Sequence, residues 1–177
     1  MNRKNIEQII QKFQFTDYKW IKPDQITIAQ WVRMKCLYGC GDVGKPACPP
    51  HVPSIEACRA LIHEYNEIVI FRFEIIMTYR EYRKDWAKAL NRQLLDLERE
   101  VFLSGCHKAF LLNVSSCNLC HECKAEKKPC KHPESLRPCP EALGIDVFAT
   151  ARAVDYPIEV LRRDSKGMNR YAILLIQ

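Results

Sequence analysis

The residues with the clearest chemical potential are five cysteines gathered within 23 residues, from Cys117 to Cys139. Cys117, Cys120 and Cys123 follow a CxxCxxC pattern, which lets three thiolates turn toward one point, as a cubic iron–sulfur cluster requires. A fourth thiolate can come from Cys130 or from Cys139, which precedes a proline as the last cysteine of a bacterial ferredoxin run does. Zinc sites more often use separated CxxC pairs. The stretch therefore favours an iron–sulfur centre, with zinc as the alternative.

An earlier group, Cys36, Cys40 and Cys48, has the spacing of a second metal site. Glycines between these cysteines allow the backbone to approach a metal or cluster, and two prolines after Cys48 keep a helix from starting there. The simpler interpretation is a glycine-rich loop with buried thiols. His51 is a further candidate ligand, although a single loop histidine is more often only solvated.

The number of cysteines and the overall charge narrow the class of protein. Ten cysteines in 177 residues point either to disulfides in a secreted protein or to metal in a reduced compartment. The start, MNRKNIEQII, lacks the apolar core of a secretory signal, and no apolar run has the length of a membrane span, so a cytoplasmic protein without a membrane segment is expected. The net charge of +6 is weak evidence for nucleic acid, since two clusters of roughly −2 each would offset most of it.

In the rest of the chain, the apolar pattern predicts an α/β (mixed α+β) fold, with one mixed sheet, packed helices and a single domain over residues 1–177. The predicted helices cover residues 4–13, 55–65, 81–103 and 147–154. The predicted strands cover residues 18–21, 26–32, 67–77, 109–114 and 171–176. Strand 67–77 is the most apolar and is expected at the centre of the sheet.

The cysteines then fall in two loops, 36–53 and 117–140, between these elements. Loops of this length without regular structure need bound metal to order them. Cys58 is spaced as a core residue of the helix over 55–65, and Cys106 directly follows a helix end, so both are expected to have structural roles.

The chain resembles an uncharacterised prokaryotic family described as predicted metal-binding proteins with a domain of unknown function. The resemblance extends from about Val32 to the C-terminus and rests on Cys36-x3-Cys40, Cys48-Pro49-Pro50, Cys117-x2-Cys120-x2-Cys123-x6-Cys130-x2-Pro133, Arg137-Pro138 and the run EALGIDV over 141–147. It implies metal binding, by iron–sulfur centres, in mainly anaerobic bacteria and archaea, and it implies no reaction. In the family pattern a serine usually stands where this chain has Cys139. The resemblance therefore favours Cys130 as the fourth ligand of the second site.

Three functions fit these observations. The first is a small carrier or redox accessory protein with two [4Fe–4S] clusters that serves a redox partner, because eight cysteines are enough for two four-cysteine sites. No Ser/His/Asp pattern, glycine-rich phosphate loop or HExxH motif competes with this hypothesis. The eight candidate ligands are Cys36, Cys40, Cys48, Cys117, Cys120, Cys123, Cys130 and Cys139.

The second function is an enzyme in which the first cluster has only three cysteines and an open iron position that binds a small substrate. The sequence interpretation leans toward such an open site, although the spacing differs from that of radical S-adenosylmethionine enzymes. The third is a structural zinc protein, with lysines around the second group to contact nucleic acid or an acidic protein. These lysines are Lys124, Lys127, Lys128 and Lys131.

Overall fold

The structure is a computed structural model that describes residues 2–76, 80–120, 123, 130–162 and 167–177. Its helices are α1 (Arg3–Lys12), α2 (Gln30–Gly39), α3 (Ile55–His63), α4 (Arg80–Leu103) and α5 (Val147–Arg152). Its strands are β1 (Tyr18–Ile21), β2 (Ile68–Ile76), β3 (Phe110–Leu112) and β4 (Gly167–Leu175). Short 3₁₀ turns follow β1 and interrupt the later cysteine segment, the last of them being η3 (Pro140–Leu143).

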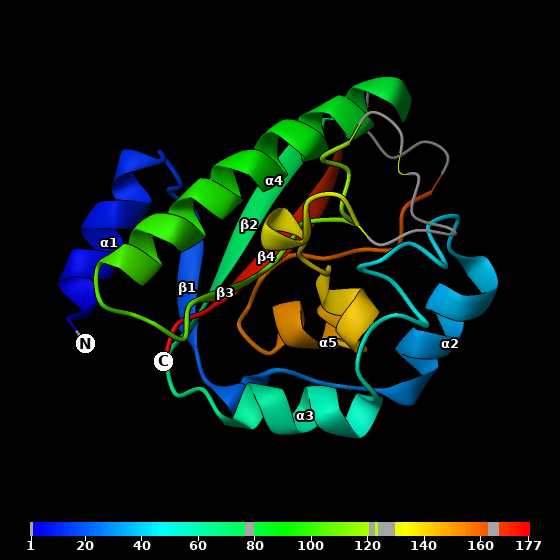
Figure 1. Cartoon of the computed structure of the whole chain (residues 1–177), viewed down its shortest axis with the longest axis horizontal. Coiled ribbons are helices and arrows are strands. Elements are labelled where there is room, and N and C mark those ends of the chain that lie inside the picture. Colours follow the sequence, from blue (N-terminus) through cyan, green and yellow to red (C-terminus); the bar gives the residue numbers. More distant parts are fainter. Residues whose placement is uncertain (1, 77–79, 121–122, 124–129, 163–166) are drawn as a thin grey trace.

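Within the described residues the strands form one sheet in the order β1-β2-β4-β3, with β2 and β4 at its centre (Figure 1). The predicted α/β class, with helices packed on a single sheet and strand 67–77 at its centre, is confirmed. The sheet is not mixed in strand direction, because each of its pairings is antiparallel. β4 lies between β2 and β3 and is antiparallel to both, so β2 and β3 run parallel to each other and are connected through α4 as a split βαβ unit.

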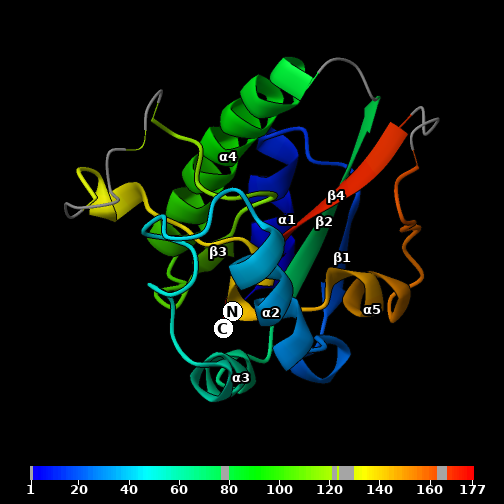
Figure 2. The same ribbon diagram turned by 90° about the vertical axis from the view of Figure 1, so that its right-hand side faces the viewer.

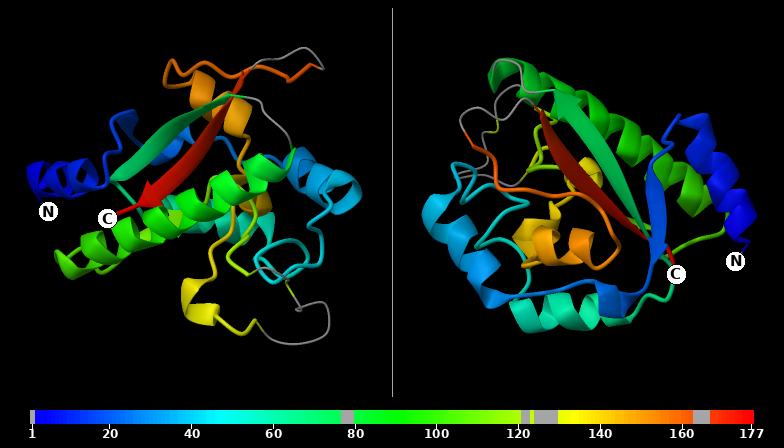
Figure 3. Two further views of the ribbon diagram at one scale, coloured as in Figure 1. Left: turned by 90° about the horizontal axis from the view of Figure 1, so that it is seen from above. Right: turned by 180° about the vertical axis from the view of Figure 1, so that it is seen from behind.

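Strand alternation divides the sheet side chains between two apolar cores. On one face, Val69 and Phe71 of β2 pack against the apolar stripe of α4 and against α1. On the other face, Ile68 and Ile70 pack with α3, with the segment around Ile145 and with α5. Figure 3 shows α4 and α5 on opposite sides of the strands. Cys58 and Cys106 are buried in these cores, as the sequence predicts.

One predicted element is wrong: residues 26–32 do not form a strand. The chain is extended only to Ala29, with Ile28 bridged to Ile145, and helix α2 begins at Gln30. Helix α2 runs to Gly39, so Cys36 lies on a helix rather than in a loop. The helix escaped prediction because its large apolar side chains do not face the core, so they give no inward-facing period of 3.6.

The other predicted elements are present with small shifts at their ends. The last strand is longer than predicted and begins at Gly167 instead of Tyr171, because residues 167–171 complete the ladder with β2. Met77, the predicted end of the central strand, lies outside the described residues. Across the described part of the chain, no helix combines the length and apolar character that a membrane span requires.

Candidate metal centre

The first three cysteines approach the segment that carries Cys139. Cys36 lies on the inner side of α2, and Cys40 is the C-terminal cap of the same helix. Helix α2 packs on η3, which begins directly after Cys139, and the Sγ of Cys36 lies 3.6 Å from the carbonyl oxygen of Glu141. The helix therefore brings Cys36 to a segment more than a hundred residues away in sequence.

Cys48 joins this group from the loop after α2. It is buried, and burial together with the neighbouring Asp42 carboxylate and Cys40 raises its pKa to about 12. Burial, followed by the charges of Glu141 and Cys48, raises the pKa of the Cys139 thiol well above its usual value. Helix α2, the loop after it and the segment before η3 carry Cys36, Cys40, Cys48 and Cys139, which we call the Cys36 group.

A backbone junction fixes η3 against the start of α2. The amide of Ala29 donates to the carbonyl oxygen of Gly144 at 2.9 Å, and the amide of Asp146 donates to the carbonyl oxygen of Thr27 at 2.8 Å. Gly144 has a φ of 81°, which a residue with a Cβ rarely adopts. Because this turn directly follows η3, the junction sets where Cys139 lies relative to α2.

The later cysteines gather in a second set. A small cavity of about 20 Å³ is lined by Cys117, Cys120, Cys123 and Cys130, together with Cys48 of the first group. Burial raises the pKa of Cys117, and the thiolates of Cys130, Cys120 and Cys123 add to this shift. We call these four residues of the later segment the Cys117 group. Since Cys48 faces both groups, the two sets are neighbours rather than separate sites.

A polar clasp ties the two cysteine segments together. Asp42 of the first segment forms an ion pair with Lys45 and accepts a hydrogen bond from the hydroxyl of Ser116, which directly precedes Cys117. These two contacts overcome the effect of burial and lower the pKa of Asp42. Lys45 lines the same cavity as the Cys117 group, and its cation interacts with both Cys123 and Cys48. The clasp therefore places the Lys45 cation, paired with the Asp42 carboxylate, beside cysteines of both groups.

A second anchor holds the chain just before Cys139 against α4. The Nε of Arg137 donates to both carboxylate oxygens of Glu98, at 3.0 Å and 2.8 Å, and this carboxylate is almost fully buried. The amide of Asn113, at the end of β3, donates to the carbonyl oxygen of Pro138 at 2.8 Å. The segment that carries Cys139 is therefore fixed by α4 and β3 on one side and by α2 on the other. Figure 2 shows these elements around the cysteine segments.

The donor set fits a thiolate-bound centre. The cavity wall combines sulfur atoms with Pro46, Ala47 and Leu136, an apolar surface, and with the cation of Lys45. Sulfur ligands of this kind suit zinc and iron–sulfur centres. Among the residues that the structure describes, no Asp or Glu of the kind that magnesium or calcium prefers lines the cavity. Within the described residues, no three Cys, His, Asp or Glu side chains lie close enough together to hold a single metal ion.

All eight candidate cysteines lie in the described part of the chain, and Cys48 of the first group lines the same cavity as the four cysteines of the Cys117 group. Cys130 lies with the CxxCxxC cysteines, as the family resemblance implies. Cys139 directly precedes η3, which packs on α2, so it lies toward the first three cysteines. His51 is exposed. Three of the four lysines considered as contact residues, Lys124, Lys127 and Lys128, lie outside the described residues.

Sequence reasoning missed the clasp residues Asp42, Lys45 and Ser116. A signal was present, since oppositely charged residues three apart inside a cysteine-rich loop suggest an internal ion pair. The Glu98–Arg137 contact had no such signal, because its partners are 39 residues apart and a glutamate on a long helix is usually solvated.

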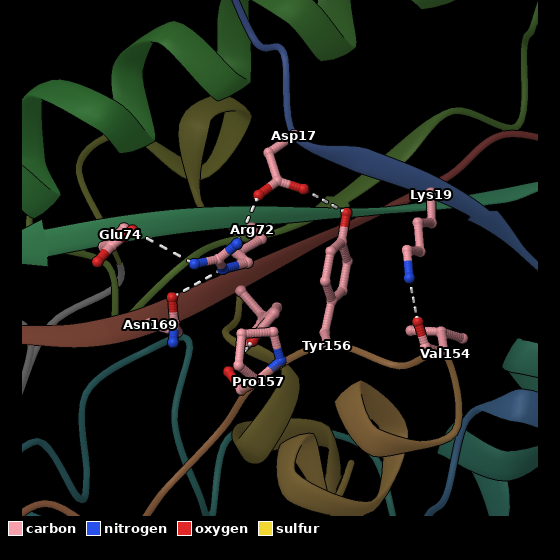
Figure 4. Close-up of polar contacts among 9 residues, drawn as sticks. Asp17, Lys19, Arg72, Glu74, Val154, Tyr156, Pro157 and Asn169 are labelled. Carbon is pink, nitrogen blue, oxygen red and sulfur yellow. Dashed lines mark hydrogen bonds and ion pairs between the residues drawn. The ribbon is translucent and has the colours of Figure 1, made fainter.

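A polar cluster around Arg72 on the sheet has a structural role (Figure 4). The Arg72 guanidinium donates to Asp17, Glu74 and Asn169, and the Tyr156 hydroxyl donates to the other oxygen of Asp17 at 2.7 Å. These contacts connect β1, β2 and β4 to the segment after α5. A hollow of about 460 Å³ beside this cluster is lined by aromatic residues and contains no cysteine. Neither feature belongs to the cysteine centre.

Comparison with curated proteins and with solved structures finds no match to the chain. A family model does match, over residues 19–176, and this range includes both cysteine groups and every element from β1 to β4. The chain therefore belongs to the family described as "Predicted metal-binding protein (DUF2284)".

Proposed function

We propose that the chain is a redox protein that holds two [4Fe–4S] clusters and passes single electrons. The Cys36 group would hold one cluster and the Cys117 group the other, each with four thiolates. The observation that carries this proposal is the cavity lined by the four cysteines of the Cys117 group, with Cys48 of the Cys36 group and Lys45 on its wall. When bound, such clusters accept and release one electron at a time without bond rearrangement in the protein.

The surroundings of the cysteines support this function. Lys45 supplies positive charge beside two centres that would each carry roughly −2. Apolar residues of the cavity wall limit solvent access, which is one of the factors that set cluster potentials. The clasp and the Arg137 anchor hold both segments from elements of the fold, as ligand segments that must keep their geometry during electron transfer require.

The position of Cys139 favours a carrier over an open-site enzyme. Cys139 precedes η3, which packs on α2, so it would supply the first set with a fourth thiolate, and a fully ligated cluster has no free iron position for a substrate. A cytoplasmic location and a redox partner protein complete the proposal. The cytoplasmic location belongs with reduced thiols, because disulfides replace free thiols in oxidising compartments.

The deciding experiment is metal analysis of protein purified without oxygen from iron-replete cells. The protein should be brown and contain about eight iron and eight acid-labile sulfide ions per chain, as two cubic clusters require. Dithionite should bleach the visible absorbance. Stoichiometric zinc without sulfide would sink the proposal and leave a structural zinc protein in its place.

A second experiment tests whether metal orders the cysteine segments. After removal of metal by a chelator under reducing conditions, limited proteolysis should cut first within residues 40–53 or 117–139, where bound metal would replace regular secondary structure. The two apolar cores do not depend on the cysteine segments, so far-UV circular dichroism should largely persist. Cooperative loss of the whole spectrum would show that the sheet depends on the metal.

A further inference from the structure

Helix α2 exposes its largest apolar side chains to solvent. Trp31 is 48% exposed, Met34 44% and Tyr38 83%, and these residues recur at the three- and four-residue spacing of one helix face. Lys35 lies on the same face, with its ammonium 5.1 Å from the centre of the Trp31 ring. We call these four residues the α2 outer face. Leu37 and Val43, also exposed, lie at its margin.

The burial pattern of α2 is the reverse of that of an ordinary surface helix. Its buried residues are Val32 and Arg33, so a charged side chain faces inward while Trp, Met and Tyr face outward. Single exposed apolar residues need no explanation, but a contiguous set of them on one helix face marks an interaction surface. Trp, Tyr and Met are also the residues that protein interfaces favour.

The α2 outer face adjoins the first cysteine group. Cys36 lies on the inner side of the same helix, and the exposed Cys40 caps it two residues after Tyr38. Figure 2 looks onto α2 from outside, and Figures 1 and 3 show it at the margin of the molecule. A protein bound over Tyr38 would therefore lie against the part of the surface nearest to the Cys36 group.

The charge of this region selects the kind of partner. Lys35 is the exposed charged residue of the stretch from Gln30 to Gly41, because Arg33 is buried and the stretch contains no Asp or Glu. The next carboxylate, Asp42, is already bound by Lys45 and Ser116. A second copy of the chain bound through the same face would bring two Lys35 side chains together. An acidic surface with an apolar centre is the complementary one.

We propose that the α2 outer face is the docking site of a small acidic electron-carrier protein, which exchanges electrons with the Cys36 group. This inference rests on the proposed function and adds to it the place and the class of the partner. In the exchange, an anionic flavin hydroquinone of the carrier loses one electron to become the neutral semiquinone, no proton moves, and one oxidised cluster gains that electron.

The test uses the cluster-loaded protein and chemically reduced flavodoxin, a small acidic carrier, mixed in an anaerobic stopped-flow instrument. The variants are Tyr38→Glu and Lys35→Glu. Each should slow electron transfer from flavodoxin at least tenfold at low salt, because each places a negative charge where an acidic surface must bind. For the unchanged protein the rate should fall as salt rises, since the attraction is screened. Reduction by dithionite, which needs no docking, should be the same in all proteins.

Leu103→Glu is the matched control. Leu103 is 70% exposed at the C-terminal end of α4, distant from α2 (Figure 1). The variant therefore introduces the same charge as Tyr38→Glu at another exposed apolar position. Its reaction with flavodoxin should match that of the unchanged protein. Iron content and the visible spectrum, measured for every variant, show whether the clusters are intact.

The outcomes separate this inference from the function on which it rests. A protein without iron and sulfide overturns the proposed function itself. Clusters that dithionite reduces but flavodoxin does not, or that react equally fast in Tyr38→Glu, overturn the docking site alone. If sedimentation shows a dimer that Tyr38→Glu converts to monomers, the α2 outer face binds a second copy and the carrier proposal fails.

Discussion

Cys139→Ala should remove about half of the iron and sulfide from the anaerobically purified protein, and Cys130→Ala should remove the other half. Cys139 precedes η3, which packs on α2, and Cys130 lines the cavity of the Cys117 group, so each change takes one thiolate from a different proposed set of four. A cluster held by three thiolates loses iron far more readily than one held by four. Alanine is chosen because a serine oxygen can itself bind iron. Iron and sulfide quantitation, with the visible spectrum, gives the result.

The control for these two variants is Cys106→Ala. Cys106 is buried in the core between α4 and the sheet, so its loss removes a thiol without removing a candidate ligand. This variant should keep its full iron content. The four-cysteine assignment of the first site is wrong if Cys139→Ala also keeps its full iron content. In that case the Cys36 group holds its cluster with three cysteines, and the open-site enzyme becomes the better hypothesis.

Gly144→Val should lower the apparent midpoint of thermal unfolding by roughly 5–15 °C, which corresponds to about 2–5 kcal/mol for a chain of this size. Two effects contribute to this loss of stability. The first is strain, because a side chain at a φ of 81° costs about 1–2 kcal/mol. A Cβ at this position would also lie 2.3 Å from Cδ1 of the buried Ile55, an overlap that costs about 1–3 kcal/mol to relieve. Because Gly144 accepts the bond from Ala29 that fixes η3 to α2, the first site should also load less iron.

Gly105→Val separates the two effects. Gly105 also has a positive φ, 104°, but a Cβ there would meet no atom within 4 Å. This variant should lower the midpoint by only roughly 2–8 °C, because strain alone remains, and it should load iron normally. Equal midpoints for the two variants would mean that Ile55 moves aside without cost. Normal iron in both would show that the Gly144 junction does not position Cys139.

The sequence predicts the sheet and its covering helices because their apolar periods are set by burial. The central strand over 67–77 and the helix over 81–103 are apolar on the faces that the two cores enclose, so their pattern can be read without knowing the fold. Helix α2 could not be found in this way. Its position depends on η3 and on the Ile28–Ile145 bridge, contacts with residues more than a hundred positions away.

The same distinction applies to the candidate site. The cysteines themselves are visible in the sequence, because their number and spacing are unusual. The proposed division of the cysteines into two sets of four cannot be read from the sequence. Cys139 is closer in sequence to Cys130 than to any member of the Cys36 group, to which it is assigned. Tertiary contacts decide its place, through Gly144 on one side and the Arg137–Glu98 contact on the other.

Because Cys48 and Lys45 each face both groups, the two proposed centres would not take up electrons independently. An electron on one centre adds negative charge next to the other and makes its reduction harder, and the apolar residues that line the shared cavity screen this repulsion poorly. One lysine cannot offset the added charge on both sides. A redox titration should therefore show two waves rather than one. Over the interval of potential between them, each molecule would store a single electron, which suits the protein to deliver electrons one by one rather than in pairs.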